Sequence, residues 1–137
     1  MMSVPYALDD VLIAARTVYG EARDQPFRGQ KAVAHVIRNR AVSGKDGPDH
    51  SIAAAALRHR QFSAWNRDNP NREKALAADV SDAAFRRALH AVLEALDEND
   101  FTKGAEHYHA RWIKPEWAVG HTPVAEIGDH IFYNGVE

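Results

Sequence analysis

The stretch LDDVLIAARTVYGEAR, which runs from Leu8 to Arg23, repeats its apolar residues at the spacing of one helical face. Asp9 and Asp10 lie where the first turn of that helix would be, and negative charge is favourable at a helix N-terminus. The following Asp24-Gln25-Pro26 ends the pattern, because proline disrupts a helix interior. The stretch therefore predicts an amphipathic helix that packs one side against a core.

Glu21 is the carboxylate whose setting suggests chemistry. It follows Gly20 near the end of the predicted helix and falls on the shoulder of the apolar stripe. We therefore expect it to be half-buried while still reaching a cleft. Burial raises the pKa of a carboxyl group, which is what a general acid working near neutral pH needs. Most glutamates are simply exposed, so this interpretation depends on motifs further along the chain.

Three further helices are expected. Gly29–Arg40 repeats apolar residues on one face and follows the break at Pro26. Ser51 is a suitable N-cap for a short helix over Ile52–Leu57. Ser81 is a suitable cap for a longer helix with apolar residues at helical spacing.

The pattern changes to short extended segments near the C-terminus. Two of them are expected to form one small antiparallel pair, Ala105–His109 and Ile127–Tyr133. No internal repeat or interdomain linker is visible, and a chain of 137 residues suits a single core. The sequence thus predicts one domain spanning residues 1–137, in the α+β class but predominantly helical, with a small β-hairpin.

The composition excludes several classes of function. A formal net charge of −2 argues against a nucleic-acid binder, and the absence of cysteine excludes disulfides, thiolate nucleophiles and zinc–thiolate sites. No run of about 18 apolar residues occurs, so no stable membrane insertion is expected. Met1–Asp10 lacks the basic and apolar regions of a signal peptide. We therefore expect synthesis in the cytoplasm without export by the ordinary secretory route.

Histidines are the candidates for metal chemistry. His107 and His109 alternate on one face of a predicted strand, with His121 and His130 downstream. Two neutral imidazoles at this spacing can share a metal ion, but no third ligand follows at a diagnostic spacing. The pattern favours histidines that hydrogen-bond in a cleft wall, and no metal site is expected. The role of the His107 and His109 pair stays open.

Aromatic side chains in irregular segments suit a carbohydrate groove, because a ring face offers stacking area beside a polar edge. Tyr108 and Trp112 are flanked by polar residues and are the better groove candidates, whereas Trp117 and Phe132 are assigned to packing. No Gly-x-Ser-x-Gly nucleophile elbow and no phosphate-binding glycine loop occur. Serine hydrolase and nucleotide-binding functions therefore find no support.

Five blocks in order resemble the cell wall hydrolase family typified by the spore-cortex-lytic enzyme SleB. They span most of the chain, and any one of them alone would be a weak signal. The blocks are Tyr19-Gly20-Glu21-Ala22-Arg23, Gly29-Gln30-Lys31-Ala32-Val33-Ala34-His35-Val36-Ile37-Arg38-Asn39-Arg40, Gln61-Phe62-Ser63, Gly104-Ala105-Glu106-His107-Tyr108-His109 and Ile127-Gly128-Asp129-His130-Ile131-Phe132-Tyr133.

The resemblance implies a compact lysozyme-like domain that cleaves the glycan strands of peptidoglycan, with its catalytic glutamate at Glu21. It places Gln61, Ser63 and Tyr108 in the substrate groove. His109 stands where relatives often carry another polar residue, and Trp112 joins the groove on the aromatic argument. The loop Asp100-Phe101-Thr102-Lys103-Gly104 departs from the Asp-Pro-Thr pattern of many relatives, and their separate peptidoglycan-binding domain has no counterpart here.

A single carboxylate without a clear partner favours lytic transglycosylation, which gives 1,6-anhydromuramic acid products. The alternative is a hydrolytic muramidase with Asp129 or Glu106 as its second carboxylate, since glycoside hydrolysis usually takes two. A non-catalytic glycan-binding virion module is the alternative from another class. We expect no cofactor and a monomer whose partner is the peptidoglycan glycan strand. Two routes to the cell wall are expected: delivery by a phage or phage-like particle, or secretion through a leader that this sequence has lost.

Overall fold

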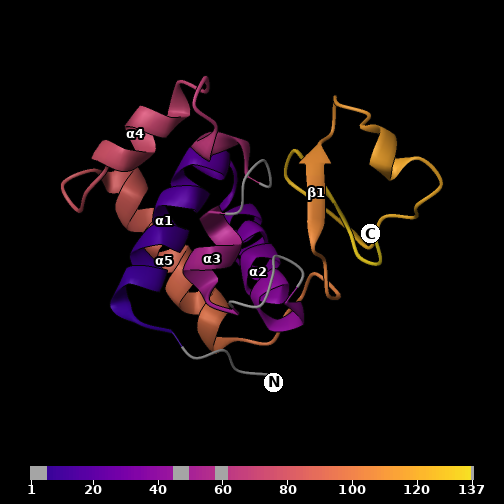
Figure 1. The fold of residues 1–137 in the computed structure, drawn as a ribbon, viewed down its shortest axis with the longest axis horizontal. Helices are drawn as coiled ribbons and strands as arrows, with labels where there is room; N and C mark the ends of the chain where they lie inside the picture. The colour runs from indigo at the N-terminus through magenta and orange to yellow at the C-terminus, as the bar shows by residue number, and fades with distance from the viewer. Residues whose placement is uncertain (1–5, 45–49, 58–61, 137) are drawn as a thin grey trace.

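The structure is a computed structural model that describes residues 6–44, 50–57 and 62–136 (Figure 1). The helices are α1 (Leu8–Ala22), α2 (Phe27–Ser43), α3 (Ile52–Leu57), α4 (Asn71–Ala77) and α5 (Ala83–Asp97). The described ranges also contain the short 3-10 helices η1 (Ser63–Trp65) and η2 (Glu116–Ala118). The strands are β1 (His107–Ala110), β2 (Ala125–Ile127) and β3 (His130–Tyr133). The predominantly helical α+β class predicted from the sequence is confirmed.

Helix α1 is the centre of the helical body, where it contacts α2, α3, α4 and α5 (Figure 1). Its inward face carries small side chains, and Ala14, Ala15 and Ala22 are almost completely buried. Small residues let helix axes approach closely, since the interaxial distance depends on the side chains at the contact. The helix begins at Leu8, as its periodicity predicted. No helix in the described ranges is both long and apolar enough to cross a membrane.

The predicted cap at Ser51 is confirmed, whereas the one at Ser81 is wrong. The Ser51 hydroxyl accepts a hydrogen bond from the amide of Ala54 at 3.0 Å, in the first turn of α3. Helix α5 instead has Asp82 as its N-cap, which accepts from the amide of Ala84 at 2.8 Å. A carboxylate satisfies a free helical N–H and also interacts favourably with the helix dipole, so Asp82 outcompetes its neighbour.

Over the described residues, the sheet has three antiparallel strands in the order β1-β3-β2, one more than the expected pair. The segment predicted to be extended over Ile127–Tyr133 turns at Gly128, so the hairpin is β2–β3 and β1 adds to the far side of β3. Gly128 has φ +58, and a Cβ there would lie 2.5 Å from Oε1 of Gln25. The turn therefore needs glycine both for its left-handed backbone and for its close approach to the α1–α2 corner.

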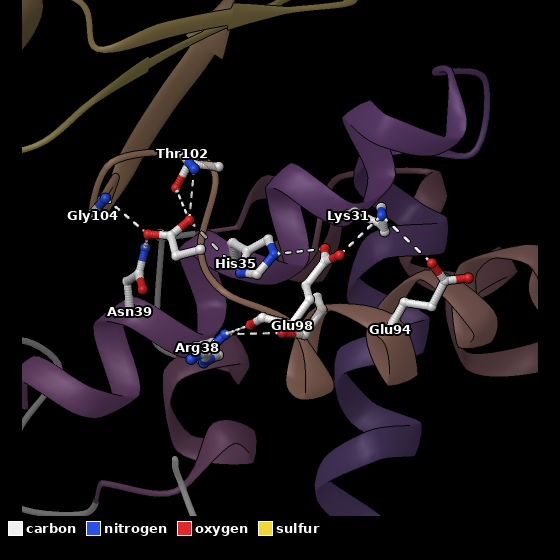
Figure 2. A network of polar contacts seen from close by, with 10 residues as sticks. Lys31, His35, Arg38, Asn39, Glu94, Glu98, Thr102 and Gly104 are labelled. Carbon is white, nitrogen blue, oxygen red and sulfur yellow. Dashed lines mark hydrogen bonds and ion pairs between the residues drawn. The ribbon is translucent and has the colours of Figure 1, made fainter. Parts of the chain in front are cut away.

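The face of α2 that carries His35, Arg38 and Asn39 holds the connection between α5 and β1 through polar contacts (Figure 2). Arg38 donates to the backbone carbonyls of Ala95 and Glu98, at 3.0 and 2.8 Å. Asn39 donates to Oδ2 of Asp100 at 2.9 Å and to the carbonyl of Ala105 at 3.0 Å. These bonds fix the start of β1 relative to α2.

The loop that departs from the relatives' pattern is closed by its own aspartate. Asp100 accepts from the amides of Thr102 and Gly104 at 2.7 and 2.8 Å (Figure 2). Both oxygens of Asp100 thus accept hydrogen bonds. Oδ1 accepts from Thr102, and Oδ2 accepts from both Gly104 and Asn39. Aspartate can cap a turn in this way without a proline, because its carboxylate bonds the backbone two residues on.

His35 lies inside this network and should make the free energy of unfolding depend on pH. Its Nε2 is 3.0 Å from Oε1 of Glu98, its Nδ1 is 3.7 Å from Asp100, and its side chain is completely buried (Figure 2). Burial lowers the pKa of His35, although the two carboxylates oppose that shift. The unfolded chain therefore binds a proton near pH 6.5 that the folded state binds only at lower pH. The free energy of unfolding should fall as the pH drops below about 6.5.

Urea unfolding at pH values from about 7 to 5 measures this effect, in a window set by the ordinary histidine pKa. The wild-type chain should lose stability across the window, and His35→Gln should lose less. The exposed His90→Gln serves as the matched control and should keep the wild-type slope. An unchanged slope in His35→Gln would show that His35 does not contribute to the pH dependence.

Candidate active site

Three segments distant in the sequence meet at Glu21, in the last turn of α1. Its Oε2 accepts from the amide of Ala64 at 2.9 Å and from the hydroxyl of Ser63 at 3.2 Å. Its Oε1 accepts from the hydroxyl of Tyr108 at 2.5 Å. The side chain is half-buried, as its place on the shoulder of the apolar stripe predicted. The carboxyl group is thus held by three donors in one orientation.

Helix η1 packs directly on α1 and reaches Glu21, because Gly20 has no Cβ to keep the two helices apart. A Cβ added at Gly20 would be 2.6 Å from the Cβ of Ala64, closer than any two such atoms can approach. Trp65 reinforces the contact, since its indole N–H donates to the hydroxyl of Thr17 at 2.8 Å. The glycine that precedes the candidate catalytic residue therefore brings the Ala64 amide within hydrogen-bonding distance of it.

Gly20→Ala is expected to lower the free energy of unfolding by about 1–3 kcal/mol, because overpacking forces η1 away from α1. The displaced Ala64 amide would also weaken any activity that depends on Glu21. The matched control is Gly29→Ala, also in a helix, where a Cβ would lie at an ordinary 3.4 Å from Gln25. Denaturant unfolding of both variants tests this. Equal stability of the two would contradict the close approach.

The sheet positions Tyr108 beside Glu21. Tyr108 lies on β1 opposite Phe132 of β3, and both residues occupy the same face. Its ring centroid is 5.6 Å from that of Phe132, 4.8 Å from His130 and 6.3 Å from Phe62. These rings restrict the phenol to an orientation in which its hydroxyl reaches Glu21.

The surroundings of Glu21 raise its pKa above that of a free glutamate. Burial is the largest cause, and the hydrogen bonds from Tyr108, Ala64 and Ser63 pull in the opposite direction without cancelling it. Burial and the neighbouring Glu21 carboxylate raise the pKa of Tyr108 well above its ordinary value. Tyr108 therefore stays protonated and donates. The arrangement suits a carboxyl group that gives up a proton near neutral pH and is then stabilised as the anion.

The other residues predicted for the groove are placed differently. Gln61 lies outside the described residues. His109 is on the sheet face opposite Tyr108, with its Nε2 2.9 Å from the hydroxyl of Tyr133 and its ring against Trp117. Trp112 is 70% exposed in the turn after β1. Of the predicted set, the structure brings Ser63 and Tyr108 to Glu21 and does not bring His109 there.

Ala64 is the contact that sequence reasoning missed. Its contribution is a backbone N–H, which every residue except proline carries, so no residue type marks it. The only signal was its place directly after Ser63, in the block Gln61-Phe62-Ser63.

The carboxylates considered as a second catalytic group have partners elsewhere. Asp129 accepts from the side-chain amide of Gln25 at 3.1 Å, and its own amide donates to Oε1 of Gln25 at 2.8 Å. Glu106 accepts from the hydroxyl of Ser43 at 2.5 Å. Asp129 thus ties the β2–β3 turn to the α1–α2 corner, and Glu106 lies at the end of α2.

Comparison with known proteins places the chain in a family. The family model described as Cell Wall Hydrolase matches residues 24–133. The spore cortex-lytic enzyme of Halalkalibacterium halodurans is 31% identical over 130 residues, which are 94% of this chain and 36% of that protein. The spore cortex-lytic enzyme of Bacillus subtilis is 29% identical over 133 residues, 93% of this chain and 38% of that protein. The chain therefore spans well under half the length of these relatives.

Two solved structures share the fold over almost their whole length. The catalytic domain of the Bacillus cereus SleB protein has a TM-score of 0.76 and 29% identity, with 94% of this chain and 92% of that one covered. The catalytic domain of the germination-specific lytic transglycosylase SleB from Bacillus anthracis has a TM-score of 0.75 and 30% identity, with 95% and 99% covered. Together with the match over residues 24–133, these similarities show that the chain belongs to the cell wall hydrolase family.

Proposed function

We propose that this chain cleaves the glycan strands of peptidoglycan between N-acetylmuramic acid and N-acetylglucosamine as a lytic transglycosylase, with Glu21 as its catalytic acid and base. The observation that carries the proposal is the setting of Glu21, a half-buried carboxyl group of raised pKa held by Ser63, Ala64 and Tyr108. The Bacillus anthracis domain of the same fold is described as a lytic transglycosylase, which supports the same chemistry here.

The reaction needs one carboxyl group in two protonation states. Protonated Glu21 gives its proton to the glycosidic oxygen as the bond to C1 of the muramic acid breaks. The Glu21 carboxylate then takes the proton of the 6-hydroxyl of the same sugar, whose oxygen bonds to C1. The products are a free sugar hydroxyl and a 1,6-anhydromuramic end, so no water is consumed and Glu21 is protonated again.

The donors around Glu21 fit both halves of this cycle. Burial favours the protonated acid before the bond breaks. Once the proton has left, the hydroxyl of Tyr108 and the amide of Ala64 stabilise the carboxylate through charge-assisted hydrogen bonds. Asp129 and Glu106 are held by Gln25 and Ser43, which favours a route with one carboxylate over a hydrolysis with two.

Product analysis in ¹⁸O-labelled water tests the proposal. Purified sacculi are digested by the wild-type chain and by Glu21→Gln, and the soluble fragments are identified by mass spectrometry. Unlabelled anhydromuramic ends that depend on Glu21 are the expected result. Reducing muramic acid ends that carry ¹⁸O would show a hydrolytic muramidase instead. Binding to sacculi without any release would show a glycan-binding module.

A further inference from the structure

A small pocket lies beside the candidate active site and shares a wall with it. Its volume is about 100 Å³. The wall that it shares with the site is Tyr108, whose hydroxyl bonds Glu21. The residues that line it come from α2, the approach to η1, the start of β1 and η2; they are Val36, Arg40, Phe62, Glu106, His107, Tyr108 and Trp117.

The polar part of this pocket combines a cation, an anion and an imidazole. Arg40 is 3% exposed, and its guanidinium donates to the backbone carbonyl of Glu106 at 2.8 Å. Glu106 lines the pocket, and its carboxylate accepts from the hydroxyl of Ser43. The ring of His107 lies 5.2 Å from that of Trp117. The pocket thus offers hydrogen-bond donors and acceptors close to one another.

The remaining walls are apolar. Val36 and Phe62 are almost completely buried, and Trp117 adds an aromatic face. A volume of about 100 Å³ equals that of roughly three water molecules, so the pocket is too small for a whole sugar ring and suits a short side group. Its occupant should be a small group with one donor, one acceptor and an apolar end.

We propose that this pocket binds the acetamido group of a glycan sugar next to the bond that is cleaved. The carbonyl oxygen of that group is an acceptor for Arg40 or His107, its N–H is a donor to Glu106, and its methyl group fits against Val36, Phe62 and Trp117. A carboxylate, such as the lactyl group of muramic acid, fits less well because it has no N–H to donate to Glu106, whereas an acetamido group has both a donor and an acceptor. The inference rests on the proposed function, which supplies a glycan as the substrate.

An acetamido group held here would orient the sugar toward Glu21, because Tyr108 contacts both the pocket and the catalytic carboxyl. The pocket would then act mainly in binding and make the enzyme selective for N-acetylated glycan. A larger side chain that fills the pocket should raise KM for N-acetylated strands and change kcat less, since the reacting atoms lie at Glu21.

The test measures binding without cleavage, by calorimetry on Glu21→Gln protein. The probes are peptide-free glycan strands in two forms, one N-acetylated and one chemically re-acylated with butyryl groups, which carry no charge but are too long for the pocket. Val36→Met fills the pocket from α2, and Val42→Met places the same change on α2 outside its lining. Glu106→Ala removes the proposed acceptor without adding bulk.

We expect the acetylated strand to bind about ten- to a hundredfold more tightly than the butyrylated one, the range that a few buried contacts supply. Val36→Met and Glu106→Ala should lose this preference, and Val42→Met should keep it. Equal binding of the two strands, no binding of either, or a preference that survives both pocket variants would overturn the inference. Product analysis in labelled water tests the cleavage separately, so failure of the pocket and failure of the proposed function are distinguishable.

Discussion

Glu21→Gln is expected to cleave glycan about a hundred- to ten-thousand-fold more slowly than the wild-type chain, because general acid–base catalysis usually contributes a factor of this size. Glutamine has one acceptor oxygen, which can keep the bond from the Ala64 amide while its NH2 group donates to the Tyr108 hydroxyl, but it has no proton to transfer at neutral pH. The loss should therefore appear in kcat rather than in glycan binding.

The same variant should fold with unchanged or slightly higher stability. Burial raises the pKa of Glu21, so the folded chain binds a proton more readily than the unfolded chain. By linkage, the wild-type chain loses stability as the pH rises from the ordinary glutamate pKa through the raised one. Glutamine carries no charge and escapes that loss.

Release of soluble muropeptides and the thermal midpoint are measured together for Glu21→Gln. The exposed Glu116→Gln is the matched control and should keep full activity. A Glu21→Gln protein with wild-type stability and substantial turnover would refute the catalytic assignment.

Tyr108→Phe is expected to lower kcat/KM by about ten- to a hundredfold, because a hydrogen bond to a charged group contributes about 1.5–3 kcal/mol. The ring that packs on Phe132 and His130 is kept, and only the hydroxyl that donates to Glu21 is lost. That hydroxyl lowers the pKa of Glu21, so its removal leaves the pKa higher still. Activity that needs protonated Glu21 declines as the pH rises through this pKa, and in the variant the decline should move to higher pH.

The pH profile of kcat/KM for wild-type and variant proteins measures both effects. Tyr133→Phe is the matched control, since its hydroxyl bonds His109 on the other face of the sheet. The Tyr133→Phe variant should keep the wild-type pH profile of kcat/KM. A Tyr108→Phe profile that coincides with the wild-type one would show that Tyr108 does not act on Glu21.

Local patterns predicted the elements well where the deciding interactions are local. The start of α1 at Leu8 and the cap at Ser51 follow from periodicity and from side chains that bond their own turn. The same reasoning failed at Ser81, because Asp82 both caps α5 and accepts from the hydroxyl of Tyr19 at 2.8 Å. A contact with α1 is not visible in the sequence of α5.

The sequence by itself determined that Glu21 would close an apolar helix in a half-buried position, since helical geometry places each residue of a helix relative to its stripe. Only the tertiary structure decided what surrounds it. Tyr108 is 87 positions away and Ala64 is 43 positions away, and Ala64 contributes a backbone amide that no residue type reveals. Their meeting depends on the close approach at Gly20 and on the polar contacts that fix β1 to α2. A carboxyl group gains its pKa from such neighbours, and chain folding alone brings them together.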